Sequence, residues 1–330
     1  MCKYANYRMS QTYHTDYDLM VVLGPTATGK TKLAVQLAYK LASEIISADS
    51  RQVYRGMDIG SGKDLNEYNL KGKKIPFHLI DIADPQQEYN VFQFQHDFQD
   101  AFSEIKRRKK LPILCGGTGF YIKSVLMDFH LPAVAPNKKL RQELENWELE
   151  ELIFELKSMS PNIPKKSLET KRRVIRAIEV QINRWIEEGG SKTELGARRR
   201  TKFEIHNPIV LGVEFPREVI RARITARLHE RLDQGMINEV EILLDNGITH
   251  ERMERFGLEY RFISRYLAGK LTQEEMIEKL NTAIHQFAKR QMTFYRNMEK
   301  NGARIHWIPE GNTVKAMEII SNKNATLKNK

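Results

Sequence analysis

Cysteine is nearly absent from this chain of 330 residues, which contains only Cys2 and Cys115. Two cysteines cannot form a framework of several disulfides or a four-cysteine zinc site, so we expect a reducing compartment. Long apolar runs are also lacking, and a run such as Leu19–Leu23 is far too short to span a bilayer. The polar stretch 1–18 has no apolar segment of the kind found in secretory signals. These absences predict a cytoplasmic protein without a membrane span, and a monomer is our starting hypothesis.

Positive charge is in excess, because 53 Lys and Arg against 42 Asp and Glu give a net charge of +11 at pH 7. A positive field of this kind attracts polyanions. The basic residues cluster at 172–176, 198–202 and 289–296. Each cluster taken alone is typical of a solvated helix face. The charge therefore favours a nucleic-acid partner only if other motifs agree with it.

Short apolar runs alternate with helical patterns in the first third of the chain. Runs typical of strands cover 19–23, 44–46, 77–82 and 111–115. Apolar residues recur at helical spacing after the first run and again over 94–105. This alternation predicts an α/β fold with a parallel sheet and right-handed crossovers.

The rhythm changes at about residue 131, and from there to 202 the patterns are helical. A strand pattern resumes at 209–213, an apolar ladder indicates a helix over 220–232, and 305–308 indicates a last strand. Thr272 and Glu275 form a capping box that opens a helix through Arg296. The tail from Ser321 is expected to be disordered. We predict five segments: a polar extension (1–17), a first core part (18–130), a helical insertion (131–202), a second core part (203–310) and a tail (311–330).

One glycine-rich segment matches the P-loop pattern in full: Gly24-Pro25-Thr26-Ala27-Thr28-Gly29-Lys30-Thr31. It lies after a predicted strand and before a predicted helix, which is where its backbone N–H groups can surround a phosphate. Lys30 adds a positive charge, and the Thr31 hydroxyl suits Mg²⁺. The motif predicts a diphosphate site, but kinases, ATPases and other transferases share it.

Two further turns follow predicted strands and should face the same crevice, because carboxyl ends of parallel strands line the ligand site. Asp49 follows the second strand, where its carboxylate can accept a proton, hold a metal or simply cap a helix. Gly116-Gly117-Thr118 follows the strand at 111–115. Its glycines allow close approach and Thr118 offers a hydroxyl, although a plain strand-to-helix turn is nearly as good a reading.

Taken together, the motifs resemble the tRNA dimethylallyltransferase family, also called tRNA isopentenyltransferases. The similarity covers nearly the whole chain from Asp18 to about Trp307, and the order of the motifs makes it far more specific than a P-loop alone. The matching segments are GPTATGKT (24–31), ADSRQVYRGMDIG (48–60), HLIDIADP (78–85), PILCGGTGFYIK (112–123), KRRVIRAIEV (171–180) and AKRQMTFYR (288–296).

The resemblance implies transfer of a dimethylallyl group from dimethylallyl diphosphate to the N6 amine of an adenine in tRNA, expected at position 37. It implies a P-loop NTPase-like core with a helical insertion, and Mg²⁺ as the cofactor. Asp49 matches the general base, and Thr118 matches the threonine of the channel where adenine meets the donor. Arg223 matches an arginine on the donor diphosphate, and Arg227, one turn away, is a weaker candidate.

The diphosphate and magnesium residues implied by the resemblance are Lys30 and Thr31, within the loop of Gly24, Pro25, Thr26, Ala27, Thr28 and Gly29. The implied tRNA contacts are Asp49, Ser50, Arg51, Gln52, Arg172, Arg173, Val174, Ile175, Arg176, Arg255, Phe256 and Gly257. The insertion that carries the cluster at 172–176 would then form one wall of a tRNA cradle.

The chain departs from the family pattern at several positions. Thr28 replaces a serine, Ser61-Gly62-Lys63-Asp64 replaces Thr-Ala-Lys-Pro, and Gly257-Leu258-Glu259 lacks the tyrosine that usually follows glycine. His285 stands at an arginine position, and Phe294-Tyr295 replaces Trp-Phe. The resemblance implies that these changes bear on the details of tRNA contact and leave the donor site intact.

Three rival functions share the P-loop. A small-molecule kinase would turn over ATP and would give the basic clusters no task. An adenylate isopentenyltransferase would use free AMP or ATP as acceptor and would need no large insertion. An RNA-binding ATPase would hydrolyse ATP without prenyl transfer. An assay of donor and acceptor separates all of them.

Overall fold

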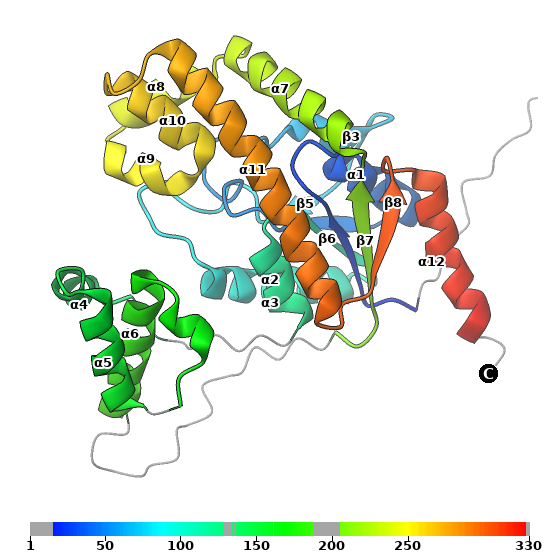
Figure 1. Ribbon diagram of the computed structural model, residues 1–330. Helices are drawn as coiled ribbons and strands as arrows, with labels where there is room; N and C mark the ends of the chain where they lie inside the picture. The colour runs from blue at the N-terminus through cyan, green and yellow to red at the C-terminus, as the bar shows by residue number, and fades with distance from the viewer. Residues whose placement is uncertain (1–15, 128–133, 135, 161, 188–204, 328–330) are drawn as a thin grey trace, which may run out of the picture. The chain divides into compact units, whose positions relative to one another are not determined.

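The computed structural model of the chain describes residues 16–127, 134, 136–160, 162–187 and 205–327 (Figure 1). The chain divides into two compact units. The larger unit combines 1–129 with 202–330, and the smaller unit consists of 130–201. The basic residues of the cluster at 198–202 and the extension up to residue 15 lie outside the described residues.

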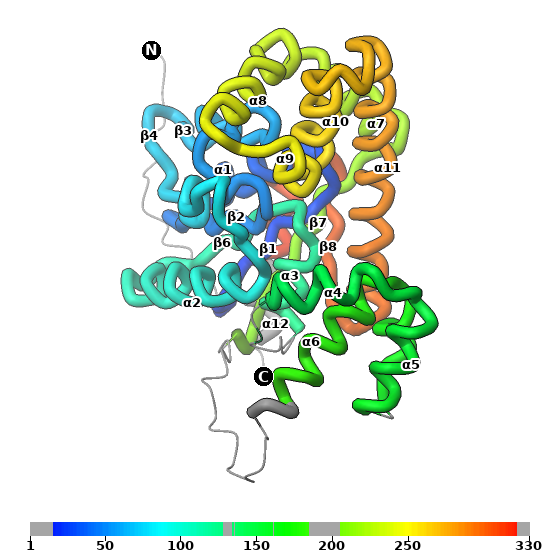
Figure 2. Tube along the Cα trace, turned by 90° about the vertical axis from the view of Figure 1, so that its left-hand side faces the viewer, coloured from blue at the N-terminus to red at the C-terminus, as the bar shows by residue number. Residues whose placement is uncertain are grey.

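The larger unit is built on a six-stranded sheet in which all strands are parallel (Figure 2). The strand order is β5-β2-β6-β1-β7-β8. The strands are β1 (Leu19–Leu23), β2 (Glu44–Ser47), β5 (Phe77–His78), β6 (Pro112–Gly116), β7 (Pro208–Glu214) and β8 (Ile305–Pro309). Because β2, β6 and β1 are neighbours, the three turns that follow them meet at one edge of the sheet. The predicted α/β fold with a parallel sheet is confirmed.

Side chains of β1 alternate between the two faces of the sheet, and the strand is fully buried because both faces are covered. Met20 and Val22 pack with α1 (Lys30–Leu41) and with α12 (Thr313–Leu327), which lies beside α1 in Figure 1. Leu19, Val21 and Leu23 pack on the other face. That face is covered by α2 (Val91–Arg107), α3 (Gly119–Leu126) and the carboxyl-terminal part of α11 (Gln273–Lys300).

A second apolar core joins the helices that follow β7. They are α7 (Arg217–Asp233), α8 (Met236–Asp245), α9 (His250–Phe256), α10 (Leu258–Leu267) and the amino-terminal part of α11. Val53 and Met57, from the segment after β2, are fully buried in the same core. The segment that begins with Asp49 is therefore fixed between the sheet and this group of helices. The capping box of Thr272 and Glu275 opens α11, as predicted.

The smaller unit is helical in the part that the structure describes. It contains α4 (Lys138–Leu144), α5 (Leu149–Met159), the short 3-10 helix η2 (Lys165–Leu168) and α6 (Lys171–Glu187). Its core is formed by Leu144, Leu152, Leu156, Val174, Ile175 and Ile178. The unit therefore buries an apolar core of its own.

Two expectations about elements were wrong. The strand expected at 77–82 ends after His78, because Leu79 and Asp81 adopt positive φ angles of 61° and 57°, which break strand geometry. The segment from Ser321 was expected to be disordered, but α12 continues to Leu327. Ala316 and Ile320 bury this helix against the sheet. A 3-10 helix, η1 (Leu65–Tyr68), and a small hairpin, β3 (Asn69–Leu70) with β4 (Lys73–Lys74), also escaped prediction.

Candidate active site

The P-loop lies between β1 and α1, where the sequence placed it. The Thr28 hydroxyl donates to the carbonyl oxygen of Pro25 at 2.8 Å, which closes the loop on itself. Because this bond needs only a hydroxyl, threonine serves where the family has serine. Lys30 begins α1 and lines the pocket at the mouth of the loop.

Helix α11 fastens the P-loop to the turn after β6, a contact that the sequence did not reveal. The side chain of Gln291 accepts a hydrogen bond from Thr26 N at 2.8 Å and donates to the Gly117 carbonyl at 2.8 Å. The Tyr295 hydroxyl donates to the same carbonyl at 3.2 Å. Gln291 is 7% exposed, so both of its bonds are protected from water. Two turns separated by more than 90 residues are thus held in one geometry.

Asp49 lies in the turn after β2 and lines the same pocket as Lys30. Its Oδ1 accepts the amide of Arg51 at 3.0 Å, so the carboxylate does cap the following turn. The capping role and a role in chemistry are compatible, because one oxygen makes the cap and the residue still faces the pocket.

Thr118 connects the turn after β6 to the turn that carries Asp49. Its Oγ1 accepts from Ser50 N at 3.0 Å, and its amide donates to the Ala48 carbonyl at 3.1 Å. The strands approach so closely here that a Cβ on Gly116 would lie 2.2 Å from the Ala48 oxygen. Only glycine fits at that position. Thr118 is not among the residues that line the pocket, and its visible contacts position the Asp49 turn.

The pocket itself combines cations, one carboxylate turn and apolar side chains. Its lining comprises Thr26, Lys30, Asp49, Arg51, Gly60, Ser61, Arg227, Arg231, Leu258, Glu259, Ile284, Phe287 and Gln291. The cations come from the edge of the sheet and from α7. Helices α10 and α11 supply the apolar members and also two polar ones, Glu259 and Gln291. A phosphate compound with an apolar tail suits such a lining.

The two arginines of α7 that the sequence singled out occupy different places. Arg227 lines the pocket, and its Nη2 donates to Thr26 Oγ1 at 2.5 Å. Arg223 is exposed, and its guanidinium carbon lies 4.0 Å from the centre of the Phe215 ring. The structure therefore brings Arg227 to the P-loop, although the sequence ranked it second.

Electrostatics in the pocket favour an incoming anion. Burial lowers the pKa of Lys30, an effect that the nearby Asp49 carboxylate opposes. Burial and the neighbouring Arg231 lower the pKa of Arg227 to about 10. The repulsion between these two cations is relieved when a polyanion enters.

Arg51 and Gln52 hold the turn after β2 against its surroundings. Arg51 Nε donates to the Phe256 carbonyl at 2.8 Å, and its guanidinium lies 5.3 Å from the centre of the Phe287 ring. Gln52 Nε2 donates to the Gly62 carbonyl at 2.9 Å. The stretch 255–257, which the resemblance assigns to tRNA contact, therefore lies directly beside the Asp49 turn.

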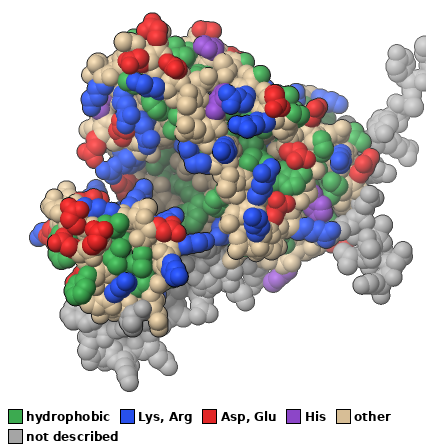
Figure 3. All heavy atoms as spheres, in the orientation of Figure 1, with side chains coloured by type: hydrophobic (Ala, Val, Ile, Leu, Met, Phe, Trp, Pro, Cys, Tyr) green, Lys and Arg blue, Asp and Glu red, His purple; other side chains and the backbone are tan. Residues whose placement is uncertain are grey.

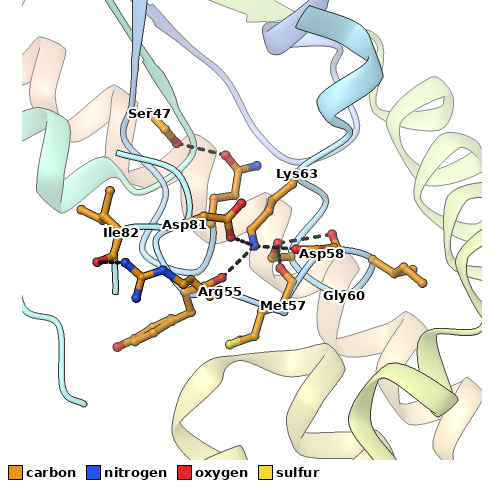
Figure 4. A network of polar contacts seen from close by, with 12 residues as sticks. Ser47, Arg55, Met57, Asp58, Gly60, Lys63, Asp81 and Ile82 are labelled. Atoms are coloured by element: carbon orange, nitrogen blue, oxygen red, sulfur yellow. Dashed lines mark hydrogen bonds and ion pairs between the residues drawn. The ribbon is translucent and has the colours of Figure 1, made fainter. Parts of the chain in front are cut away.

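A buried lysine stabilises the loop between Tyr54 and Lys63 (Figure 4). Lys63 is 1% exposed and donates to the Tyr54 carbonyl at 2.7 Å. Its Nζ also pairs with Asp58 at 2.6 Å and with Asp81. A cation in this position is satisfied on all sides and closes the loop as a unit. Lys63 is thus a structural residue within 61–64, the stretch that differs from the family pattern.

Glu239 on α8 anchors the same loop from the opposite side, and sequence reasoning missed it. Its carboxylate accepts the amides of Asp58 and Ile59 at 2.7 Å and of Gly60 at 3.0 Å. It also accepts the Tyr260 hydroxyl at 2.9 Å. No local motif marks Glu239, because the three amides that it accepts lie about 180 residues away in the chain.

The basic residues of α6 are not equivalent. Arg172 is exposed. Arg173 pairs with Glu169, and Arg176 donates to Glu179 at 2.5 Å and to the Val134 carbonyl at 2.8 Å. Val174 and Ile175 are 0% and 3% exposed in the core of the smaller unit. Their side chains serve packing. Arg172 and Arg173 are the exposed side chains of this segment, and Arg173 pairs with Glu169.

The other residues predicted to contact tRNA also include both exposed and buried side chains. Arg255 is exposed and pairs with Glu251 at 2.7 Å, whereas Phe256 is buried at 4%. Lys289, Arg290 and Arg296 are exposed along α11. Figure 3 shows Lys and Arg side chains over this helix on the face that it presents. Exposed cations therefore lie along α11, the helix that also carries Gln291.

The donor set fits Mg²⁺ in one specific way. Thr31 is half-buried beside the Cys115 thiol, with which its side chain forms a hydrogen bond, and Asp49 supplies a carboxylate to the pocket that Lys30 lines. Among the described residues, no group of three or more His, Cys, Asp or Glu could hold a metal by itself. This set suits an ion held chiefly by substrate phosphates and water, as Mg²⁺ commonly is.

A P-loop facing a carboxylate, with arginines and apolar side chains in the same pocket, is typical of an α/β enzyme that acts on a phosphate compound. Two family models match the chain: IPP transferase over residues 52–298 and Isopentenyl transferase over 17–81. The chain belongs to the tRNA dimethylallyltransferase family, and it is therefore a prenyltransferase. The predicted family and enzyme class are confirmed.

Individual relatives agree with this assignment. The chain is 50% identical over 293 residues to "tRNA dimethylallyltransferase 2" of Bacteroides fragilis, covering 89% of this chain and 93% of the relative. It is 47% identical over 312 residues to "tRNA dimethylallyltransferase 1" of Parabacteroides distasonis, covering 93% and 99%. The predicted function, dimethylallyl transfer to an adenine of tRNA, agrees with these names.

Solved structures show the same fold. The tRNA isopentenylpyrophosphate transferase of Bacillus halodurans matches with a TM-score of 0.66 and 34% identity, over 94% of this chain and 97% of that one. A eukaryotic dimethylallyltransferase acting on tRNA matches with a TM-score of 0.71 over 93% and 77%, and its 24% identity bears on the fold alone. The predicted P-loop NTPase-like core is confirmed. Within the described part of the chain, no helix has the length and apolar character of a membrane span.

Proposed function

We propose that the pocket binds dimethylallyl diphosphate with its diphosphate on the P-loop, and presents its allylic carbon to the N6 amine of an adenine in tRNA. One observation carries this proposal. A single pocket holds Lys30 and Arg227, which suit a diphosphate, and Asp49, which suits a proton on the acceptor. The apolar side chains of Leu258, Ile284 and Phe287 complete it and suit a five-carbon tail.

The cations of the pocket act on the leaving group. As the bond between the allylic carbon and the diphosphate oxygen breaks, negative charge builds on that oxygen. Lys30 and Arg227 stabilise this charge more strongly than they stabilise the bound substrate, which lowers the barrier. Mg²⁺, held by the Thr31 hydroxyl and the diphosphate, would add positive charge at the same oxygens.

Asp49 acts on the acceptor. An exocyclic adenine amine is a poor nucleophile, because its lone pair is delocalised into the ring. In the proposed reaction Asp49 aligns this amine and accepts its proton while the carbon–nitrogen bond forms. The Arg51 amide bound to Oδ1 keeps the carboxylate fixed, which favours one productive orientation. Thr118, through Ser50, positions this turn.

The tRNA must present its adenine outside the base stack, as enzymes that modify bases require. We assign position 37 of the anticodon loop as the site, on the family resemblance. Arg51 lines the pocket, and Arg255, Arg172 and the cations of α11 are exposed, so all of them can meet the phosphates of a splayed loop. RNA loops are recognised by such phosphate contacts together with pockets for flipped bases.

The test is incubation with labelled dimethylallyl diphosphate, Mg²⁺ and unmodified tRNA, followed by nucleoside analysis. We expect the label on adenosine of the tRNA, at N6 and at position 37. AMP and ATP serve as rival acceptors, and ATP alone tests for hydrolysis. Label on free AMP would favour an adenylate isopentenyltransferase. ATP turnover without prenyl transfer would contradict the proposal.

A further inference from the structure

Arg231 is a buried cation at the edge of the pocket. It lies one helical turn beyond Arg227 on α7, is 6% exposed, and lines the pocket together with Lys30 and Asp49. A guanidinium in this position has lost most of its water, and a buried charge is costly unless an anion compensates for it.

The stretch 61–64 makes room for this guanidinium. A Cβ on Gly62 would lie 2.1 Å from Arg231 Nη2, so any other residue would displace the arginine. Gly62 also has a φ of +67°, a conformation that glycine adopts without strain. Asp64, two residues later, provides the counter-charge. Gly62 and Asp64 are two of the positions at which this chain departs from the family pattern.

The compensation that Asp64 gives is incomplete. Its Oδ2 lies 3.5 Å from Arg231 Nη2, and the Asp64 side chain is 52% exposed. Nη2 is nevertheless buried without a hydrogen-bond partner. An arginine usually pairs with a carboxylate through two short bonds. Arg231 makes neither, and thus retains unused donors beside a pocket for an anion.

Arg227, the neighbouring cation on α7, also indicates an anion at this place. Arg227 and Arg231 lie close enough that Arg231 contributes to lowering the pKa of Arg227. Two neighbouring guanidinium groups repel each other, and an anion placed between them relieves that repulsion. The pair is arranged for a ligand with more than one negative charge.

We propose that Arg231 is a further diphosphate-binding residue, which donates from its guanidinium to the donor's diphosphate beside Lys30 and Arg227. The inference rests on the proposed donor site. Asp64 orients the guanidinium until the diphosphate binds, while Gly62, which has no side chain, leaves room for Arg231. Inorganic diphosphate, which the reaction releases, should bind through the same contact.

The experiment measures binding of inorganic diphosphate with Mg²⁺ by calorimetry, and the KM values for donor and tRNA. Arg231→Met keeps the apolar stem and removes the charge. We expect diphosphate affinity to fall about 10- to 100-fold, the range for a lost charged hydrogen bond, with the KM for tRNA unchanged. The diphosphate affinity of Arg231→Lys should lie between that of the wild type and that of Arg231→Met. Arg221→Met, on the same helix but exposed and outside the pocket, is the matched control and should bind as the wild type does.

Asp64→Asn separates ligand binding from a structural ion pair. If Arg231 serves the diphosphate, this variant should bind it at least as tightly as the wild type, because the competing carboxylate is gone. Equal losses of affinity in Asp64→Asn and Arg231→Met would show a structural pair and overturn the proposal. Unchanged affinity in Arg231→Met, beside a strong loss in Lys30→Met, would overturn it while leaving the donor site intact. Unchanged affinity in Lys30→Met would overturn the donor site itself.

Discussion

Gln291 shows how one residue can set the geometry of a whole site. Its side-chain oxygen and nitrogen each bind a backbone group, one in the P-loop and one in the turn after β6. If the amide were lost, the Thr26 amide would lose its partner, whereas the Gly117 carbonyl would keep the Tyr295 hydroxyl. An unsatisfied buried group costs more than the bond itself contributed.

Gln291→Met should therefore destabilise the protein and weaken donor binding together. The unsatisfied Thr26 amide predicts a loss of roughly 1–3 kcal/mol in the free energy of unfolding, measured with urea. The KM for the donor should rise because the P-loop loses its anchor. Gln286→Met, on the same helix but exposed, is the control. A normal donor KM in Gln291→Met would show that the loop holds its shape without α11.

Three arginines of α7 have the same side chain but different surroundings. Residues 223, 227 and 231 recur at helical spacing, and the family resemblance favoured Arg223 over Arg227 for the donor diphosphate. The fold decides the matter, because Arg227 reaches Thr26 and Arg231 fits against Gly62, while Arg223 rests on Phe215. Side chains with the same chemistry thus acquire different roles through packing.

At the scale of elements, strands and helices with strong local signals were predictable. The strand at Leu19–Leu23, the P-loop and the capped start of α11 agree with the structure, because apolar spacing and capping residues act locally. The short β5 was overestimated, since positive φ angles leave no apolar signature. Glu239 and Gln291 were missed because their partners are distant in sequence. Local rules predict elements, and tertiary contacts complete the site.

The amino-terminal end of β2 offers a test of acid stability. Glu44 is buried beside His78, Lys110 and Arg108. Burial alone would raise the pKa of Glu44, but hydrogen bonds from these three side chains outweigh it and lower the pKa to about 2. The ionised carboxylate therefore stabilises the fold above its ordinary pKa of about 4.5. That stability disappears as the pH falls from about 4.5 through 2.

Glu44→Gln should reveal this contribution. At pH 7 the variant should be less stable than the wild type by about 3 kcal/mol, the value that a shift of this size implies. The difference should shrink as the pH falls from 5 towards 2, because the wild-type carboxylate becomes protonated. Urea unfolding of both proteins across this range provides the measurement. A difference that stays constant with pH would mean that the charge of Glu44 does not stabilise the fold.

At the scale of the whole molecule, the net charge of +11 suits a polyanionic substrate. Within α6 the structure separates the exposed Arg172 from Arg173 and Arg176, which are engaged in pairs with glutamates. Reversing Arg176 would also disrupt the buried Glu179, so Arg172 is the cleaner site for a test.

Arg172→Glu should weaken tRNA binding and leave donor binding unchanged. In the wild type, affinity for tRNA should fall steeply with salt, by ~10³-fold or more between low and moderate concentrations, because phosphate contacts release counterions. The variant should show a shallower dependence. Lys157→Glu makes the same charge change at another exposed position of the same unit. Equal effects of the two variants would point to net charge in place of a contact by Arg172.

The most direct test of the proposed chemistry is single-turnover transfer by Asp49→Asn, at saturating tRNA and donor, beside a thermal melt. Asparagine caps about as well as aspartate, so the bond to the Arg51 amide should persist and the melting temperature should barely move. If Asp49 is the base, the transfer rate should fall roughly 10²–10⁴-fold, while tRNA affinity changes much less. A transfer rate within a few-fold of the wild type would remove Asp49 from the mechanism and leave it as a cap.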